Sequence, residues 1–182
     1  MEIRWDQAFV ASCAPVDGAD PQITVTELAS DAAVLGFRGF PRETSPDGSV
    51  PLVYEHDAID LVSPFKDFPG SYTRHGEVGE LLRAADDRFA IFGPGDGIRI
   101  SFRADRLPPL RDGQKRTFLV KTSGYCKDMD LYTAHPDTVE PLPFRAMSGY
   151  PYPPPQAYPA DPERDAYRRE WNTRLVPPNP AR

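Results

Sequence analysis

Four carboxylates between residues 128 and 140 are the side chains of this sequence best placed to bind a metal ion: Asp128, Asp130, Asp137 and Glu140. Ca²⁺ takes crowded oxygen ligands, and Asp-x-Asp spacing lets two carboxylates converge from one turn. An EF-hand would continue with a third acid or Asn and a glycine, where this chain continues with Leu-Tyr-Thr. Two interpretations stay open: a calcium site, and a loop whose polar side chains make turn and capping hydrogen bonds.

The same loop raises the question of catalysis by carboxylates. A hydrolase or lyase would use Asp128 and Asp130, with His135 as a further candidate, but an acid pair catalyses only where its surroundings separate the two pKa values. The chain has no dinucleotide-binding glycine motif, Walker loop, Gly-x-Ser-x-Gly elbow or His-Glu-x-x-His motif. His56, His75 and His135 lie in separate segments without the paired spacing of zinc ligands. The sequence therefore favours a non-enzymatic role, and we assign no catalytic residue.

Aromatic side chains near the acidic loop form the second candidate site. Five of them are candidate ligand-binding residues: Tyr125, Tyr132, Phe144, Tyr150 and Tyr152. Rigid rings on proline-restricted backbone can recognise sugar rings or a partner chain at low entropic cost. They can equally pack a tail without ladder hydrogen bonds onto a sheet and cover its edge. Both interpretations stay open.

Composition narrows the function classes. The formal net charge of -6 argues against sequence-independent binding to nucleic acid, which requires a basic surface. No apolar run approaches the length of a membrane span, and the first residues lack the basic and apolar regions of a signal peptide. The two cysteines, Cys13 and Cys126, either form one disulfide or are two unrelated residues of a reducing compartment.

Prolines divide the chain into a body and a tail. Of the 22 prolines, 12 lie in residues 136–182, so we expect a β-rich body over 1–135 and an extended tail over 136–182. Asp161 can cap a short tail helix near residues 162–173, with Pro162 in its first turn. Ala166, Tyr167 and Trp171 then dock it on the body, within one domain.

Period-two patterns dominate the body. Alternation predicts strands over 3–10, 22–29, 33–40 and 116–122, and a hairpin of 88–92 and 98–102 around the glycine-rich turn 93–97. A short helix is expected over 77–85, with Val78, Leu81 and Leu82 on one face. The fold class predicted is mainly β: an antiparallel, jelly-roll-like β-sandwich with one or two short peripheral helices and the proline- and aromatic-rich tail packed on it.

Long segments of the chain resemble one bacterial family. They are IRWDQAF from Ile3, GSYTRHGEVGELLRAADDRFAIFGPGDGIRISF from Gly70, KDMDLYTAHPDTVEPLPFRAMSGYPY from Lys127 and YPADPERDAYRREWNTR from Tyr158. Together they resemble the C-terminal module of secreted proteins with FG-GAP (VCBS-type) repeats and an ASPIC/UnbV segment, of the cartilage acidic protein-like type. The family pattern has Trp before Lys-Asp-Gly-Asp, where this chain has Cys126 before Lys-Asp-Met-Asp.

The resemblance implies an extracytoplasmic, periplasmic or secreted, location and a non-catalytic binding or assembly role. Its expected partners are other domains of the same or a partner protein. A carbohydrate- or glycan-binding module and a carboxylate-dependent hydrolase or lyase are the alternatives. Expected cofactors are none or calcium.

Overall fold

Strands in antiparallel sheets make up most of the regular structure. The computed structural model describes residues 2–11, 24–50, 52–128 and 131–178. Over these residues it contains one α-helix, α1 (Pro162–Trp171), and two short 3-10 helices, η1 (Gly79–Leu82) and η2 (Ala104–Arg106). The predicted mainly β class with few short helices is confirmed.

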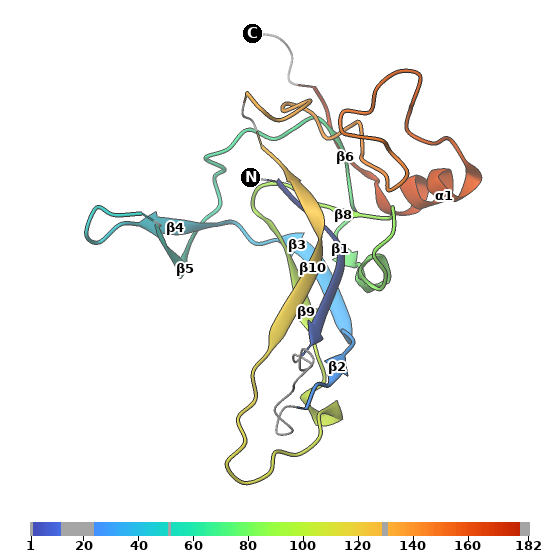
Figure 1. Ribbon diagram of the computed structural model, residues 1–182. Helices are drawn as coiled ribbons and strands as arrows, with labels where there is room; N and C mark the ends of the chain where they lie inside the picture. Colours follow the sequence, from blue (N-terminus) through green and yellow to red (C-terminus); the bar gives the residue numbers. More distant parts are fainter. Residues whose placement is uncertain (1, 12–23, 51, 129–130, 179–182) are drawn as a thin grey trace.

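The strands fall into four sheets (Figure 1). The first contains β1 (Glu2–Ala11), β2 (Glu27–Leu28), β8 (Ala90–Ile91) and β10 (Leu119–Lys127). The second has the order β7 (Gly76–Glu77), β3 (Ala32–Phe37), β9 (Asp96–Ser101). Two-stranded sheets join β4 (Phe40–Thr44) to β5 (Val53–Asp60) and β6 (Gly70–Tyr72) to β11 (Arg174–Val176).

The longest ladder pairs the two ends of the body. β1 runs antiparallel to β10 along its whole length, with a register shift between Trp5 and Gln7. The strand predicted over 3–10 is confirmed. The strand predicted over 116–122 begins later, at Leu119, and continues to Lys127, because β1 supplies backbone partners as far as that residue.

The predicted hairpin over 88–102 is wrong. β8 pairs with β1 and β9 pairs with β3, so the two segments belong to different sheets. The turn between them does form: the Asp96 N–H donates to the Gly93 carbonyl at 3.1 Å, and Gly95 has φ 78°. A glycine-rich turn therefore reversed the chain without pairing the strands on either side of it.

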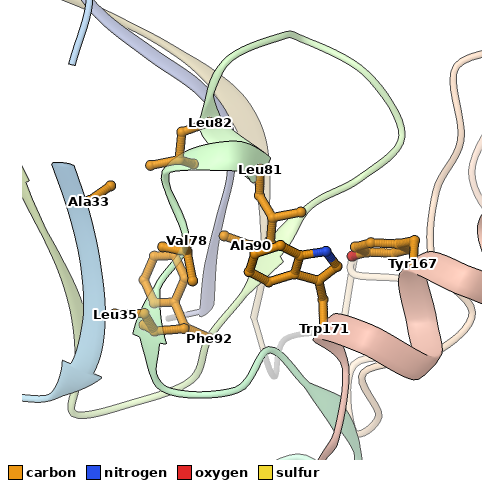
Figure 2. Packing of buried hydrophobic residues seen from close by; sticks show 9 residues of the cluster. All are labelled: Ala33, Leu35, Val78, Leu81, Leu82, Ala90, Phe92, Tyr167 and Trp171. Atoms are coloured by element: carbon orange, nitrogen blue, oxygen red, sulfur yellow. The ribbon is translucent and has the colours of Figure 1, made fainter. Parts of the chain in front are cut away.

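β8 lies between two buried clusters, since its successive side chains point to opposite faces. Ala90 belongs to the first cluster, which Figure 2 shows: Ala33, Leu35, Val78, Leu81, Leu82, Ala90, Phe92, Tyr167 and Trp171. Ile91 belongs to the second: Phe68, Tyr72, Phe89, Ile91, Val139 and Leu142. Both clusters mix residues of the body and the tail.

The two predicted helices differ in outcome. Asp161 caps α1 as expected, its carboxylate accepting from the Arg164 N–H at 2.9 Å. Tyr167 and Trp171 are buried, whereas Ala166 is exposed. The helix predicted over 77–85 is only the single 3-10 turn η1, because the preceding residues are paired with β3 as β7.

Two segments project from the rest of the chain (Figure 1). The first, residues 40–67, contains β4, β5 and the turn between them; we call it the hairpin arm. The second, residues 103–121, is the long loop from β9 to the start of β10; we call it the loop arm. Among the described residues, β4 and β5 pair only with each other, and most of their side chains are exposed on both faces.

Candidate functional site

The acidic loop is only partly described. Asp130 lies outside the described residues. Asp128 is half-buried just after β10, Asp137 is exposed, and the Glu140 carboxylate accepts from the Ser71 N–H at 3.2 Å. Over the part of the chain that the structure describes, no three His, Cys, Asp or Glu side chains gather as metal ligands. Because Asp130 is undescribed, calcium binding and acid pairing at Asp128 stay predictions.

Lys127 anchors this loop to the sheet. Its side chain is only 1% exposed, and its ammonium donates to the carbonyls of Thr138, Val139 and Glu140 at 2.5, 3.3 and 3.5 Å. These oxygens replace the water that a buried cation loses. The ammonium also lies 6.0 Å from the centre of the Tyr150 ring. The last residue of β10 therefore fixes the first turn of the tail.

The five aromatic candidates occupy three different surroundings. Phe144 is 4% exposed and lies 5.3 Å from Tyr152, whose ring is 6.3 Å from that of Tyr150. Tyr125 instead packs edge-on against Phe89, at 5.3 Å. Tyr132 is 98% exposed. The structure brings three of the five together, and these three pack mainly on one another.

The clustered rings are also tied to the backbone of the tail. The Tyr150 hydroxyl donates to the Pro141 carbonyl at 2.8 Å. Phe144 packs against Tyr158 at 6.0 Å, and burial raises the pKa of the Tyr158 phenol. Such mutual packing stabilises the tail and leaves Tyr150 and Tyr152 half-buried. The hypothesis of a sugar-binding surface stays untested.

A buried carboxylate that sequence reasoning missed joins the tail to the body. Asp96 is 3% exposed at its side chain and contacts His75 Nε2 at 3.1 Å and the Arg174 guanidinium at 2.5 Å. It also accepts from the Gly93 N–H at 3.2 Å. Arg174 lies 5.2 Å from the centre of the Tyr72 ring. Its two side-chain partners, His75 and Arg174, are 21 and 78 residues away in sequence, so no local pattern could have indicated them.

An aspartate that orients a histidine can support acid–base chemistry if a nucleophile is close. Here the hydroxyl of Thr73, two residues before His75, is fully buried. It donates to Asn172 Oδ1 at 3.3 Å and accepts from the Ile91 N–H at 2.7 Å. The hydroxyl therefore already makes one hydrogen bond as donor, to the tail, and one as acceptor, within the body, so the arrangement connects segments of the body and the tail.

Two shallow hollows flank α1. One, of about 270 Å³, is lined by Ser71, Asp165, Arg168, Arg169 and Asn172. The other, of about 180 Å³, is lined by Asp86, Asp87, Arg88, Glu163 and Arg164. Both mix positive and negative groups, and in the second the Arg164 guanidinium is already paired with Asp87 at 2.5 Å. Small-molecule sites are deeper and mainly apolar.

Most of the large apolar side chains that the described part of the chain exposes lie on the two arms. On the hairpin arm they are Val50, Leu52, Val53, Tyr54, Ile59, Leu61, Val62 and Phe65, and on the loop arm Leu110, Phe118, Leu119 and Val120. Val62 is 83% exposed and Phe118 58%. Apolar side chains gathered in this way mark surfaces that bind another chain.

In the described part of the chain, the contacts that hold the hairpin arm to the body lie at its base. Phe40 is 7% exposed and packs against Phe37 and Phe65, with ring centres 6.0 and 6.1 Å away. The N–H groups of Arg38 and Gly39 donate to the Gly95 carbonyl at 2.6 and 3.1 Å. The turn 93–97 therefore holds the hairpin arm and, through Asp96, the tail.

Comparison with known proteins adds no identification. No protein family, curated protein or solved structure matches this chain. Within the described ranges, no helix has the length and apolar character needed to cross a bilayer. Cys126 is exposed, and Cys13 lies outside the described residues, so the predicted alternatives for a disulfide are not tested.

Proposed function

We propose that this chain is a non-catalytic binding or assembly module of an extracytoplasmic protein. It contacts other domains of the same or a partner protein through the hairpin and loop arms. The observation that carries this proposal is that, over the described residues, most of the exposed large apolar side chains lie on the two projecting arms.

The physical argument begins with the hairpin arm. A two-stranded hairpin alone is marginally stable in water, since it has no third strand or helix to cover an apolar face. Here β4 and β5 form a sheet of their own, and Val53, Tyr54 and Ile59 are exposed. A partner surface that covers these side chains would stabilise the arm, and the outer edges of its strands can pair with another chain.

The resemblance noted in the sequence points the same way. In the family that the chain resembles, this module follows repeats that build neighbouring domains, and no enzyme activity is carried over from it. The shallow hollows of mixed charge beside α1 also favour contact over small-molecule chemistry. An extracytoplasmic location is part of the proposal on this ground.

Site-specific photo-crosslinking tests the proposal in the cells that make the protein. A photoreactive phenylalanine replaces Tyr54 in the hairpin arm or Phe118 in the loop arm. Arg169, exposed on α1, is the matched control position. We expect discrete crosslinked polypeptides from both arms and none from position 169. If the folded variants are present at the wild-type level and neither arm position crosslinks, the proposal is overturned.

A further inference from the structure

We infer that the hairpin arm of one molecule binds the loop arm of a second copy of this chain. The inference rests on the proposed function and names the partner. Four observations support it: opposite charge, exposed apolar side chains on both arms, the separate directions in which the arms project, and their size.

The hairpin arm is acidic. Residues 40–67 contain six acids and two bases. The acids are Glu43, Asp47, Glu55, Asp57, Asp60 and Asp67. Over the described residues, none of these carboxylates forms an ion pair, and Asp47 is engaged by the Ser49 N–H at 3.0 Å and hydroxyl at 2.6 Å. The arm therefore presents negative charge around its exposed apolar side chains.

The loop arm is basic. Residues 103–121 contain six bases and two acids, which reverses the composition of the hairpin arm. Arg103 pairs with Asp105 in the arm, and Arg106 pairs with Asp31 at 3.1 Å. Arg111, Lys115 and Arg116 form no ion pair with the rest of the described chain. This positive charge lies in the same arm as the exposed Leu110, Phe118 and Val120.

Opposite charges select the pairing. Two hairpin arms or two loop arms would bring like charges together, which disfavours such contacts, whereas a hairpin arm against a loop arm places opposite charges around apolar centres. Figure 1 shows the arms leaving the body in different directions, so the pairing is between molecules. A contact between two different surfaces closes into a ring or continues as an open chain.

The size of the arms fits such a contact. A stable interface uses about 20 to 30 residues on each side. The hairpin arm has 28 residues and the loop arm 19. Burying the large apolar side chains of both arms removes them from water in the same step, which is the main favourable contribution to association.

Sedimentation velocity of the purified chain, from micromolar to millimolar concentration, tests the inference. The wild type should self-associate at about 0.1 M salt and dissociate towards monomer at about 1 M, where the Debye length falls to about 3 Å. Glu55→Lys with Asp57→Lys reverses charge on the hairpin arm, and Lys115→Glu with Arg116→Glu reverses it on the loop arm. Each double variant alone should self-associate about tenfold more weakly than the wild type, a loss of about 1.4 kcal/mol in the free energy of association.

Mixing the two double variants is the decisive measurement. Each then offers the native arm that the other lacks, so the mixture should associate at concentrations at which either variant alone is mainly monomeric. Arg168→Glu with Arg169→Glu on α1 is the control, since it makes the same charge change as Lys115→Glu with Arg116→Glu but away from both arms, and it should retain wild-type association. Circular dichroism verifies folding. If a reversal unfolds the chain, Glu55→Gln with Asp57→Asn takes its place and should weaken association severalfold.

The results separate this inference from the proposed function. A wild type that is monomeric at every concentration in low salt, or a mixture that fails to recover association, would overturn the second-copy partner. If arm positions then crosslink in cells to a different polypeptide, the binding role stands without self-association. If the arms crosslink to nothing, both proposals fail.

Discussion

The C-terminal tail and the hairpin arm both carry large apolar side chains on backbone that contains prolines, yet the tail is packed and the arm is exposed. Tail residues Val139, Leu142 and Phe144 are at most 4% exposed, whereas Val53 and Leu61 of the arm are 53% and 73% exposed. Apolar content alone therefore does not decide which segment joins the core.

Hydrogen bonds to the body distinguish the packed tail from the exposed hairpin arm. The body supplies donors and acceptors to the tail at several points: the Lys127 ammonium binds three tail carbonyls, and the Tyr167 hydroxyl donates to the Phe89 carbonyl at 2.6 Å. Over the described residues, the corresponding bonds at the hairpin arm lie at its base, where the Arg38 and Gly39 N–H groups donate to the Gly95 carbonyl. A segment without regular pairing is buried where its backbone polar groups find partners.

The largest expected effect comes from removing the tail's main apolar anchor. Trp171 is 5% exposed in the first cluster (Figure 2), and the Arg74 guanidinium lies 4.4 Å from the centre of its ring. Trp171→Ala should lower the free energy of unfolding by about 3–5 kcal/mol. Urea denaturation followed by circular dichroism measures it.

Tyr54→Ala is the matched change on the hairpin arm. Tyr54 is 52% exposed, so in dilute, high-salt solution its replacement should alter the free energy of unfolding by no more than about 0.5 kcal/mol. Similar losses for the two variants would contradict the contrast between a packed tail and an uncovered arm.

The next largest effect tests the buried cation. Lys127→Met keeps the length of the side chain but removes the ammonium that donates to the carbonyls of Thr138, Val139 and Glu140, of which the last keeps the hydroxyl of Thr138 as a donor. Hydrogen bonds to charged groups contribute about 1.5–3 kcal/mol, so we expect a loss of that size in the free energy of unfolding. Faster amide exchange at Val139, whose N–H donates to the Pro69 carbonyl at 2.9 Å, should accompany it.

Lys121→Met on the same strand is the control, because Lys121 is exposed. It should change the free energy of unfolding by no more than about 0.5 kcal/mol. A loss at position 121 equal to that at position 127 would mean that the charge of β10, and not the three carbonyl contacts, stabilises the fold.

Local patterns predicted those elements whose stabilising contacts lie within a few residues. The alternating sequence pattern over 3–10 predicted the strand β1, and Asp161 and Pro162 predicted where α1 begins. The prediction of a hairpin over 88–102 was wrong because burial against distant parts of the chain determines the strand partners. The side chains from Phe89 to Phe92 lie in both buried clusters, and β8 pairs with β1.

The candidate sites depended still more on distant contacts. Tyr125 and Tyr132 are close in sequence, but one ring packs against Phe89 and the other is almost fully exposed. Glu140, predicted as a metal ligand, accepts from the Ser71 N–H, 69 residues away. The buried Asp96 gave no local signal of its pairing, since His75 and Arg174 are 21 and 78 residues away.

A smaller effect should distinguish the base of the hairpin arm from the tip of the loop arm. Gly95 and Gly113 have nearly equal φ values, 78° and 79°, which cost an alanine about 1–2 kcal/mol. A Cβ on Gly95 would also lie 2.5 Å from the Phe37 ring and 2.7 Å from that of Phe40, whereas nothing lies within 4 Å at Gly113. Gly95→Ala should therefore destabilise more than Gly113→Ala in thermal denaturation. Equal losses of stability in the two variants would mean that the Phe37 and Phe40 rings move aside without a measurable cost.

The smallest effect concerns pH and the start of the tail helix. The hydrogen bond from the Arg164 N–H, aided by the Arg164 side chain, lowers the pKa of Asp161 below its ordinary value. A carboxyl whose pKa is lower in the folded than in the unfolded state stabilises the fold above its unfolded pKa, and this contribution is lost as pH falls through the folded value. The loss thus occurs below about pH 4. In an NMR titration, the Asp161 carboxyl should titrate below its ordinary pKa, and exchange of the Arg164 amide should quicken through the same range relative to Asp161→Asn, which caps the helix without titrating. A midpoint at the ordinary value would show that the cap does not hold the carboxylate, and that the tail is kept in place by its buried anchors alone.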